Sequence, residues 1–147
     1  MIIVVGLKYF SLSDFRGEWP FLAVDLMQRA DMFAMEVSQR GSRVVVSPVP
    51  GAMLRWDKEG EGEGKTEHRY GRAIDVMIDG PTTLAECRDI AKEVGFSGIG
   101  VYPDWRPCKG CHLDIRPGRA LGNPATWAGI NQDGKQVYVA IERGFYA

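Results

Sequence analysis

The sequence predicts an α+β domain, in which a small, mostly antiparallel sheet carries helices on one of its faces. A long segment before Gly41 has apolar residues at three- and four-residue steps, which is typical of an amphipathic helix. Segments 72–78 and 111–115 alternate between apolar and polar residues, as strands do when one face is covered. At 147 residues the chain matches the roughly 100–200 residues of one domain, so we expect a single domain over residues 1–147.

In the first half of the chain we expect a strand at the N-terminus, then a long helix and a second strand. The apolar stretch MIIVVGLKYF at residues 1–10 reads as the first strand. Pro20 suits the first turn of a helix, and the apolar positions that follow it run from Phe21 to Val37. Arg43–Ser47 is a short strand candidate, whereas the charged, glycine-rich segment 57–65, DKEGEGEGK, is expected to be a mobile surface loop.

The second half of the chain adds strands and a shorter helix. Three further strands are expected, which are Arg72–Ile78, Gly98–Tyr102 and Cys111–Ile115. Thr83-Leu-Ala-Glu86 is a capping box that begins a helix running to about Val94. Residues 128–147 form a C-terminal extension, where the turn signal Asp133-Gly134 predicts a hairpin.

Charge and composition exclude several classes of partner. The formal net charge of −1 gives no basic surface for nucleic acid or an anionic membrane, so we expect neither partner. The apolar N-terminus is too short for the core of a signal peptide or for a membrane span. We therefore expect a protein without a signal peptide, made in the cytoplasm as a monomer. The odd number of cysteines, 3 in all, argues against a disulfide framework.

The alternating strands place a carboxylate and an imidazole on the same side of the sheet. With the aliphatic residues of both strands under the helices, Asp75 and His112 stand on the uncovered face. The other histidine of the chain, His68, precedes Asp75 by seven residues. Two ring nitrogens and one carboxylate oxygen leave a fourth tetrahedral position for water, which is the arrangement of a catalytic zinc site.

The stretch Cys108-Lys-Gly-Cys-His112 also fits the pattern that attaches haem to c-type cytochromes. A haem would take His112 as its axial ligand and leave His68 and Asp75 without a role, so we expect no haem. The thiols of Cys108 and Cys111 have other uses: a disulfide, buried small side chains, or two ligands of a zinc knuckle.

The residues around His68 resemble a known signature. Thr66–Asp75, THERYGRAID, resembles S-x-H-x-x-G-x-A-x-D of the zinc D-Ala-D-Ala carboxypeptidase and hedgehog-like peptidase family, with Thr66 in the place of Ser. Gly98–Pro103 followed by His112-Leu-Asp114 resembles the second motif of that family. Tyr9–Phe15 is similar to the N-terminal segment of its small bacterial and phage members.

The resemblance implies a function as well as a fold. It implies a small antiparallel sheet flanked by helices, with zinc held on the open face by His68, Asp75 and His112. It implies hydrolysis of peptide bonds in peptidoglycan stem peptides or cross-links, by a carboxypeptidase or an endopeptidase. Peptidoglycan peptides are then the partners, and zinc is the cofactor. A chain without a signal peptide suits a phage or prophage enzyme released at lysis, or a virion component.

Departures from the family pattern leave the catalytic residues open. Relatives carry an acidic residue a few positions before the last ligand, where this chain has Lys109. Asp104 is the first candidate for the general base, and Asp114 is the second, or else a residue that orients its neighbour. Arg55 is the nearest substitute for the family's substrate-binding arginine, and Thr66 is a further substrate contact. The alternative function is a non-catalytic, zinc-stabilised domain for cell-wall binding or virion assembly.

Overall fold

The computed structural model describes residues 6–55 and 67–147. Met1–Val5 of the expected first strand, the expected loop 57–65 and the candidate Thr66 lie outside the described residues, and residues 6–10 form no strand. A short helical turn at residues 67–69 precedes β2. The elements in chain order are η1 (Leu12–Phe21), α1 (Val24–Ser38), β1 (Arg43–Val46), β2 (Ala73–Asp79), α3 (Leu84–Glu93), β3 (Gly98–Tyr102), β4 (Gly110–Asp114), β5 (Ala125–Gln132), β6 (Lys135–Val139) and η2 (Ile141–Gly144).

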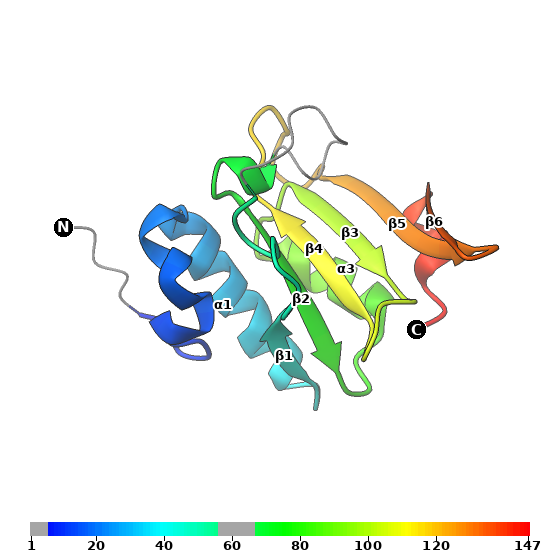
Figure 1. Cartoon of the computed structure of the whole chain (residues 1–147), viewed down its shortest axis with the longest axis horizontal. Helices are drawn as coiled ribbons and strands as arrows, with labels where there is room; N and C mark the ends of the chain where they lie inside the picture. Colours follow the sequence, from blue (N-terminus) through cyan, green and yellow to red (C-terminus); the bar gives the residue numbers. More distant parts are fainter. Residues whose placement is uncertain (1–5, 56–66) are drawn as a thin grey trace.

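The described strands form a six-stranded sheet in the order β1-β2-β4-β3-β5-β6 (Figure 1). Four neighbouring pairs are antiparallel, but β3 and β5 pair in parallel, so the sheet is mixed and the expected mostly antiparallel sheet is corrected. The cause lies in the segment between β4 and β5. Asp114, at the end of β4, and Ala125, at the start of β5, both pair with Gly98 on β3. After β4 the chain therefore crosses the end of β3. Strand β5 then begins on the other side of β3 and runs in the same direction as β3.

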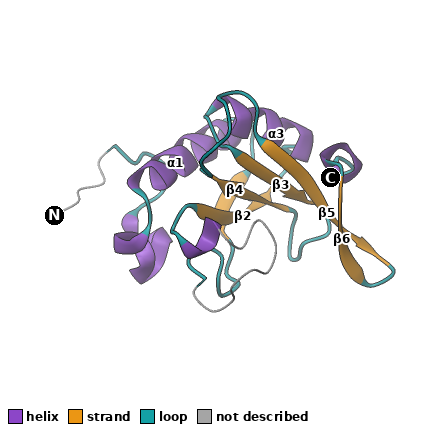
Figure 2. Cartoon of the chain, turned by 90° about the horizontal axis from the view of Figure 1, so that it is seen from above, coloured by secondary structure: helices purple, strands orange, loops and turns teal. Residues whose placement is uncertain are grey.

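Both long helices cover one face of the sheet, and Figure 2 shows them on the same side of the strands. Helix α1 packs on β1 and β2, while α3 packs on β3 and β4. The alternating aliphatic residues of the central strands face these helices. The core residues of β2, β3 and β4 on this face are Ile74, Val76, Ile78, Ile99, Val101, Cys111 and Leu113. The opposite face of the same strands carries the residues that alternate with them, among which are Asp75, His112 and Asp114.

Helix α3 begins where its capping box predicts, whereas α1 begins later than Pro20 predicts. Helix α3 begins as predicted, because the Thr83 hydroxyl accepts a hydrogen bond from the Glu86 amide at 3.1 Å. Helix α1 begins at Val24 instead of near Pro20. Pro20 belongs to η1, and Leu22 after it has extended backbone (φ −95°, ψ 144°), which separates the two helices.

A buried carboxylate on α1 fastens the start of the described chain. Asp31, only 4% exposed, accepts backbone hydrogen bonds from Lys8, Tyr9 and Phe10 at 2.8, 2.9 and 2.8 Å. Hydrogen bonds to an ionised acceptor are stronger than neutral ones, so residues 8–10 are held against α1. No helix of the described residues is both long enough and apolar enough to cross a bilayer.

Candidate metal centre

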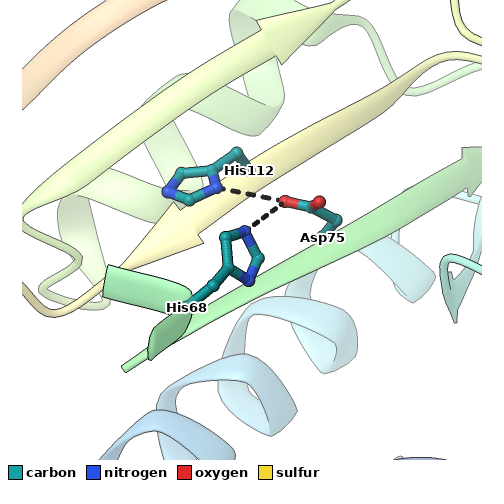
Figure 3. Close-up of side chains that lie close together, drawn as sticks. All are labelled: His68, Asp75 and His112. Atoms are coloured by element: carbon teal, nitrogen blue, oxygen red, sulfur yellow. Dashed lines mark hydrogen bonds and ion pairs between the residues drawn. The ribbon is translucent and has the colours of Figure 1, made fainter. Parts of the chain in front are cut away.

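Three elements bring His68, Asp75 and His112 together (Figure 3). Asp75 on β2 lies directly opposite His112 on β4 in the antiparallel pairing. His68 comes from the helical turn at residues 67–69, which folds over the open face just before β2. Gly71 joins that turn to β2 with φ +67°, and a Cβ there would clash with the Phe21 carbonyl oxygen. The glycine of the THERYGRAID motif therefore allows the backbone to turn in a crowded place.

The ligand atoms of these residues converge on one point. Asp75 Oδ1 lies 3.1 Å from His112 Nδ1 and 3.4 Å from His68 Nε2. One ligand atom from each residue lies within 4.8 Å of the other two, a spacing that could hold a metal ion. The side chains are shielded from water, with His68 2%, His112 3% and Asp75 9% exposed.

Each histidine has its second ring nitrogen held by an acceptor. His68 Nδ1 donates to the Met53 carbonyl oxygen at 2.9 Å, which leaves Nε2 as the nitrogen facing Asp75. His112 Nε2 donates to Asp114 Oδ2 at 2.7 Å, which leaves Nδ1 facing the same oxygen of Asp75. Metal-ligating histidines generally have such a partner, because it sets the tautomer and the ring orientation.

Asp114 is itself fully buried, at 0% exposure, and Arg116 compensates its charge. The Arg116 amide and Nε donate to Oδ1 at 3.0 and 2.9 Å, and Nη2 donates to Oδ2 at 2.8 Å. Gly98, opposite Asp114 on β3, provides the space, because a Cβ there would clash with this carboxylate. Arg116 thus fixes the Asp114 carboxylate, which in turn orients the His112 ring through Nε2.

The electrostatics of the cluster favour ionised carboxylates. Burial alone would raise the pKa of Asp75, but hydrogen bonds from His112 and His68 hold that pKa well below its usual range. Asp114 behaves in the same way: burial opposes ionisation, while His112 and Arg116 lower the pKa further than burial raises it. For His112, burial would lower the pKa, but the hydrogen bonds to Asp114 and Asp75 raise it to about 9. A positive charge is therefore favoured between these two carboxylates.

The donor set fits zinc. Two imidazole nitrogens and one carboxylate oxygen are among the ligands zinc uses in proteins, and three protein ligands with one open position form its catalytic arrangement. Both rings are already oriented, and the carboxylate between them is ionised. A cation bound between the two rings would take the place of the positive charge that Asp75 and Asp114 favour on His112.

The other predicted site residues occupy different places. Arg55 lies at the edge of the cluster, with Nη2 3.7 Å from Asp75 Oδ2 and hydrogen-bonded to the Gly51 carbonyl oxygen at 3.0 Å. Asp104 is not part of the cluster. Its Oδ2 accepts hydrogen bonds from the Asn131 amide at 2.6 Å and from the Tyr146 hydroxyl at 2.7 Å, which tie the end of β3 to the C-terminal segments.

The cysteines take no part in this cluster. All three are free thiols, and Cys108 is not paired with Cys111. Cys111 points to the helix-covered face, opposite to the face of its neighbour His112, and interacts there with Cys87 of α3. The Cys-x-x-Cys-His pattern thus contributes only His112 to the metal centre.

An aromatic group beside the cluster was not predicted from the sequence. Trp127 of β5 lies over Gly100, and its ring centroid is 5.3 Å from that of His112. Its Nε1 donates to the Tyr102 hydroxyl at 2.9 Å, and Tyr102 stacks on Trp105 with ring centroids 4.2 Å apart. The signal that could have revealed this group is the pair of glycines on the open face of β3, since a strand glycine often marks a close approach.

The buried side chains of His68, Asp75 and His112, on the sheet face opposite the helices, could hold a metal ion with the ligand types that zinc hydrolases use. Comparison with protein-family models matches residues 26–121 to the family described as Peptidoglycan L,D-endopeptidase MepK. The match covers more than half of the 147 residues, and the chain belongs to this zinc peptidase family of the hedgehog/DD-peptidase type. Neither the curated proteins nor the solved structures gave a match.

Membership supports peptidoglycan peptidase activity in general terms. The matched segment contains His68, Asp75 and His112 together with Arg55. Trp127 follows the matched segment, although its ring contacts His112.

Proposed function

We propose that the chain is a zinc-dependent endopeptidase that cleaves peptide bonds in peptidoglycan stem peptides or cross-links. The observation that carries the proposal is the convergence of His68 Nε2, Asp75 Oδ1 and His112 Nδ1. The family name supports an L,D-endopeptidase over a D-Ala-D-Ala carboxypeptidase. We take residues 1–147 as one catalytic domain that acts as a monomer.

In this proposal His68, Asp75 and His112 hold the zinc. Zinc bound at such a site polarises a scissile carbonyl and lowers the pKa of a water molecule to about 7. The protein supplies orientation: Met53 and Asp114 keep both rings in place, and Arg116 keeps Asp114 in place. Burial of the three ligands keeps bulk water from weakening these contacts.

Arg55 is the proposed contact for a negatively charged group of the substrate. Its side chain is 28% exposed, so it can reach a bound peptide while it stays beside Asp75. A guanidinium group binds a carboxylate through two parallel hydrogen bonds, and peptidoglycan stem peptides carry free carboxylates. Thr66, which stands where the family motif has Ser, is proposed as a second substrate contact.

The general base has two candidates, and both carboxylates already have partners. To accept a proton at the cluster, Asp104 would have to release Asn131 and Tyr146 when the substrate binds. Asp114 has its Oδ2 on His112 Nε2 and both oxygens on Arg116, which suits orientation better than proton transfer. Lys109, at the position where relatives have an acid, cannot act as a base while it is protonated.

Because neither carboxylate is free to act as the general base, a second candidate function is favoured: a zinc-stabilised domain that binds cell-wall peptides or takes part in virion assembly without cleaving a bond. Among the described residues, the metal-ligating cluster contains one carboxylate, Asp75, and it is a proposed ligand. Under either candidate the chain is proposed as a phage or prophage protein, and Tyr9–Phe15 is similar to the N-terminal segment of both the small bacterial and the phage members of the family.

The test is turnover of purified peptidoglycan and of defined stem peptides, with the products identified by mass spectrometry. We expect cleavage that stops with a chelator and returns with added zinc, and that is lost in His112→Ala. Release of internal fragments supports the endopeptidase, while release of terminal D-Ala alone supports the carboxypeptidase. Zinc binding with no cleavage of any peptide would establish the non-catalytic candidate.

A further inference from the structure

Tyr102 lies on the same face of the sheet as the candidate metal ligands Asp75 and His112. Gly100 on β3 pairs with His112, and Tyr102, two residues further along, shares its face. Tyr102 is only 7% exposed. A Cβ at Gly129 of β5 would clash with its ring, so the side chain leans toward β5. Its hydroxyl meets Trp127 Nε1, which itself lies over Gly100.

The hydrogen bonding of this hydroxyl is incomplete. An indole N–H can only donate, so in the 2.9 Å bond with Trp127 the oxygen of Tyr102 is the acceptor. The hydroxyl proton of Tyr102 must then point elsewhere. Within residues 6–55 and 67–147, Trp127 is the one hydrogen-bond partner of this hydroxyl, and no acceptor takes its proton. A buried donor without an acceptor is unfavourable, unless a ligand supplies one.

The position of the hydroxyl indicates where that ligand atom would lie. Trp127, which binds the hydroxyl, has its ring 5.3 Å from the ring of His112. Burial raises the pKa of Tyr102 well above its ordinary value, and the negative charge of Asp75 adds to the rise. Tyr102 is therefore within electrostatic reach of Asp75, and it keeps its proton at neutral pH.

We propose that Tyr102 is a catalytic residue that donates a hydrogen bond to the carbonyl oxygen of the scissile peptide. This inference rests on the proposed peptidase function. Negative charge develops on that oxygen when the carbonyl carbon is attacked, and a donor that is already oriented stabilises the charge without reorganisation. The proton stays on Tyr102, so no proton transfer is involved.

Trp127 is a positioning residue in this scheme. Its N–H occupies one lone pair of the Tyr102 oxygen and thereby restricts the direction of the hydroxyl proton. Stacking of Trp105 on the Tyr102 ring, with 16° between the planes, limits rotation of the ring itself. A hydroxyl fixed in this way loses little entropy when it binds the substrate oxygen.

The test compares Tyr102→Phe, which removes the hydroxyl and keeps the ring, with the wild-type protein. The matched control is Tyr138→Phe, because Tyr138 is 63% exposed on β6. Four quantities are measured for each protein: zinc content, kcat and KM on a purified muropeptide dimer, and the affinity of the zinc-free protein for that dimer by calorimetry. The affinity of the zinc-free protein reports ground-state binding separately from catalysis.

For Tyr102→Phe we expect kcat to fall by about 10²–10³-fold, which is typical for the loss of one such donor. Zinc content, KM and the affinity of the zinc-free protein should stay at wild-type values, and Tyr138→Phe should match the wild type throughout. Trp127→Phe keeps an aromatic ring without the N–H, and should lower kcat by roughly 5- to 10-fold, the worth of one neutral hydrogen bond.

Two results would overturn the inference while leaving the peptidase function intact. One is a kcat for Tyr102→Phe less than about 100-fold below that of an active wild type. The other is a fall in kcat that accompanies lost zinc or weaker binding by the zinc-free protein, because Tyr102 would then be structural. If the wild-type protein cleaves no peptide, the proposed function fails, and the role of Tyr102 fails with it.

Discussion

Replacing Asp114 by Asn tests whether the buried carboxylate behind His112 prepares the metal centre. In the structure the carboxylate accepts the His112 Nε2 proton at 2.7 Å and three hydrogen bonds from Arg116. Asparagine has almost the same shape, but it has one acceptor oxygen and no charge. Its amide nitrogen must face either His112 or Arg116, and both of these are donors.

The expected loss can be worked out from these contacts. Removing the partner of a ligating histidine typically costs 10–100-fold in metal affinity, which is about 1.4–2.8 kcal/mol. The metal-free protein should also become less stable, because breaking a buried ion pair costs about 3–5 kcal/mol. The substituted asparagine would keep one acceptor oxygen for Arg116, so we expect a stability loss near the lower end of that range.

The two effects are measured separately. Zinc affinity is obtained by competition with a chromophoric chelator, and stability is obtained from denaturant unfolding of the metal-free protein. Asp133→Asn is the control, because Asp133 is exposed at the turn between β5 and β6 and its positive φ of 53° is tolerated by Asn. Zinc affinity within about threefold of wild type in Asp114→Asn would show that Asp114 does not prepare His112, since the expected loss is at least tenfold.

Three further substitutions test other parts of the structure. Gly98→Ala should lower the free energy of unfolding by about 1–3 kcal/mol, because the added Cβ clashes with the Asp114 carboxylate; unchanged denaturant unfolding would contradict the packing. Asp31→Asn should cost about 1.5–3 kcal/mol and should speed hydrogen exchange at the amides of residues 8–10; intact protection of these amides would refute that anchoring role. Asp104→Asn should lower the unfolding temperature by weakening the contacts to Asn131 and Tyr146; a loss in kcat of about 100-fold or more, with zinc retained, would identify Asp104 as the general base, whereas a kcat within a few-fold of wild type would remove it as a candidate.

Local patterns were sufficient to predict the strands that form the centre. The alternation in 72–78 and 111–115 predicted that Asp75 and His112 share a face, because the side-chain period of a strand is two residues. The capping box at Thr83 predicted where α3 begins, since its hydrogen bonds join residues three positions apart. Periodicity did not place His68, because it does not connect a helical turn to a strand; His68 was grouped with these residues as the other histidine of the chain and through the THERYGRAID motif.

Contacts between segments far apart in the sequence decided the strand order and the partners of Asp104. The parallel pairing of β3 with β5 depends on where the chain crosses after β4, which no local pattern records. Asp104 follows a strand end, as the sequence predicted, yet residues far along the chain, Asn131 and Tyr146, bind its carboxylate.

The pairing of distant segments also decided which aromatic residues lie beside the candidate metal centre. Tyr102 and Trp127 are 25 residues apart in the chain, and they meet because β5 pairs with β3. Sequence periodicity specifies which face a side chain occupies. Which residues meet across that face depends on strand order and register, and burial of the whole core selects both of these.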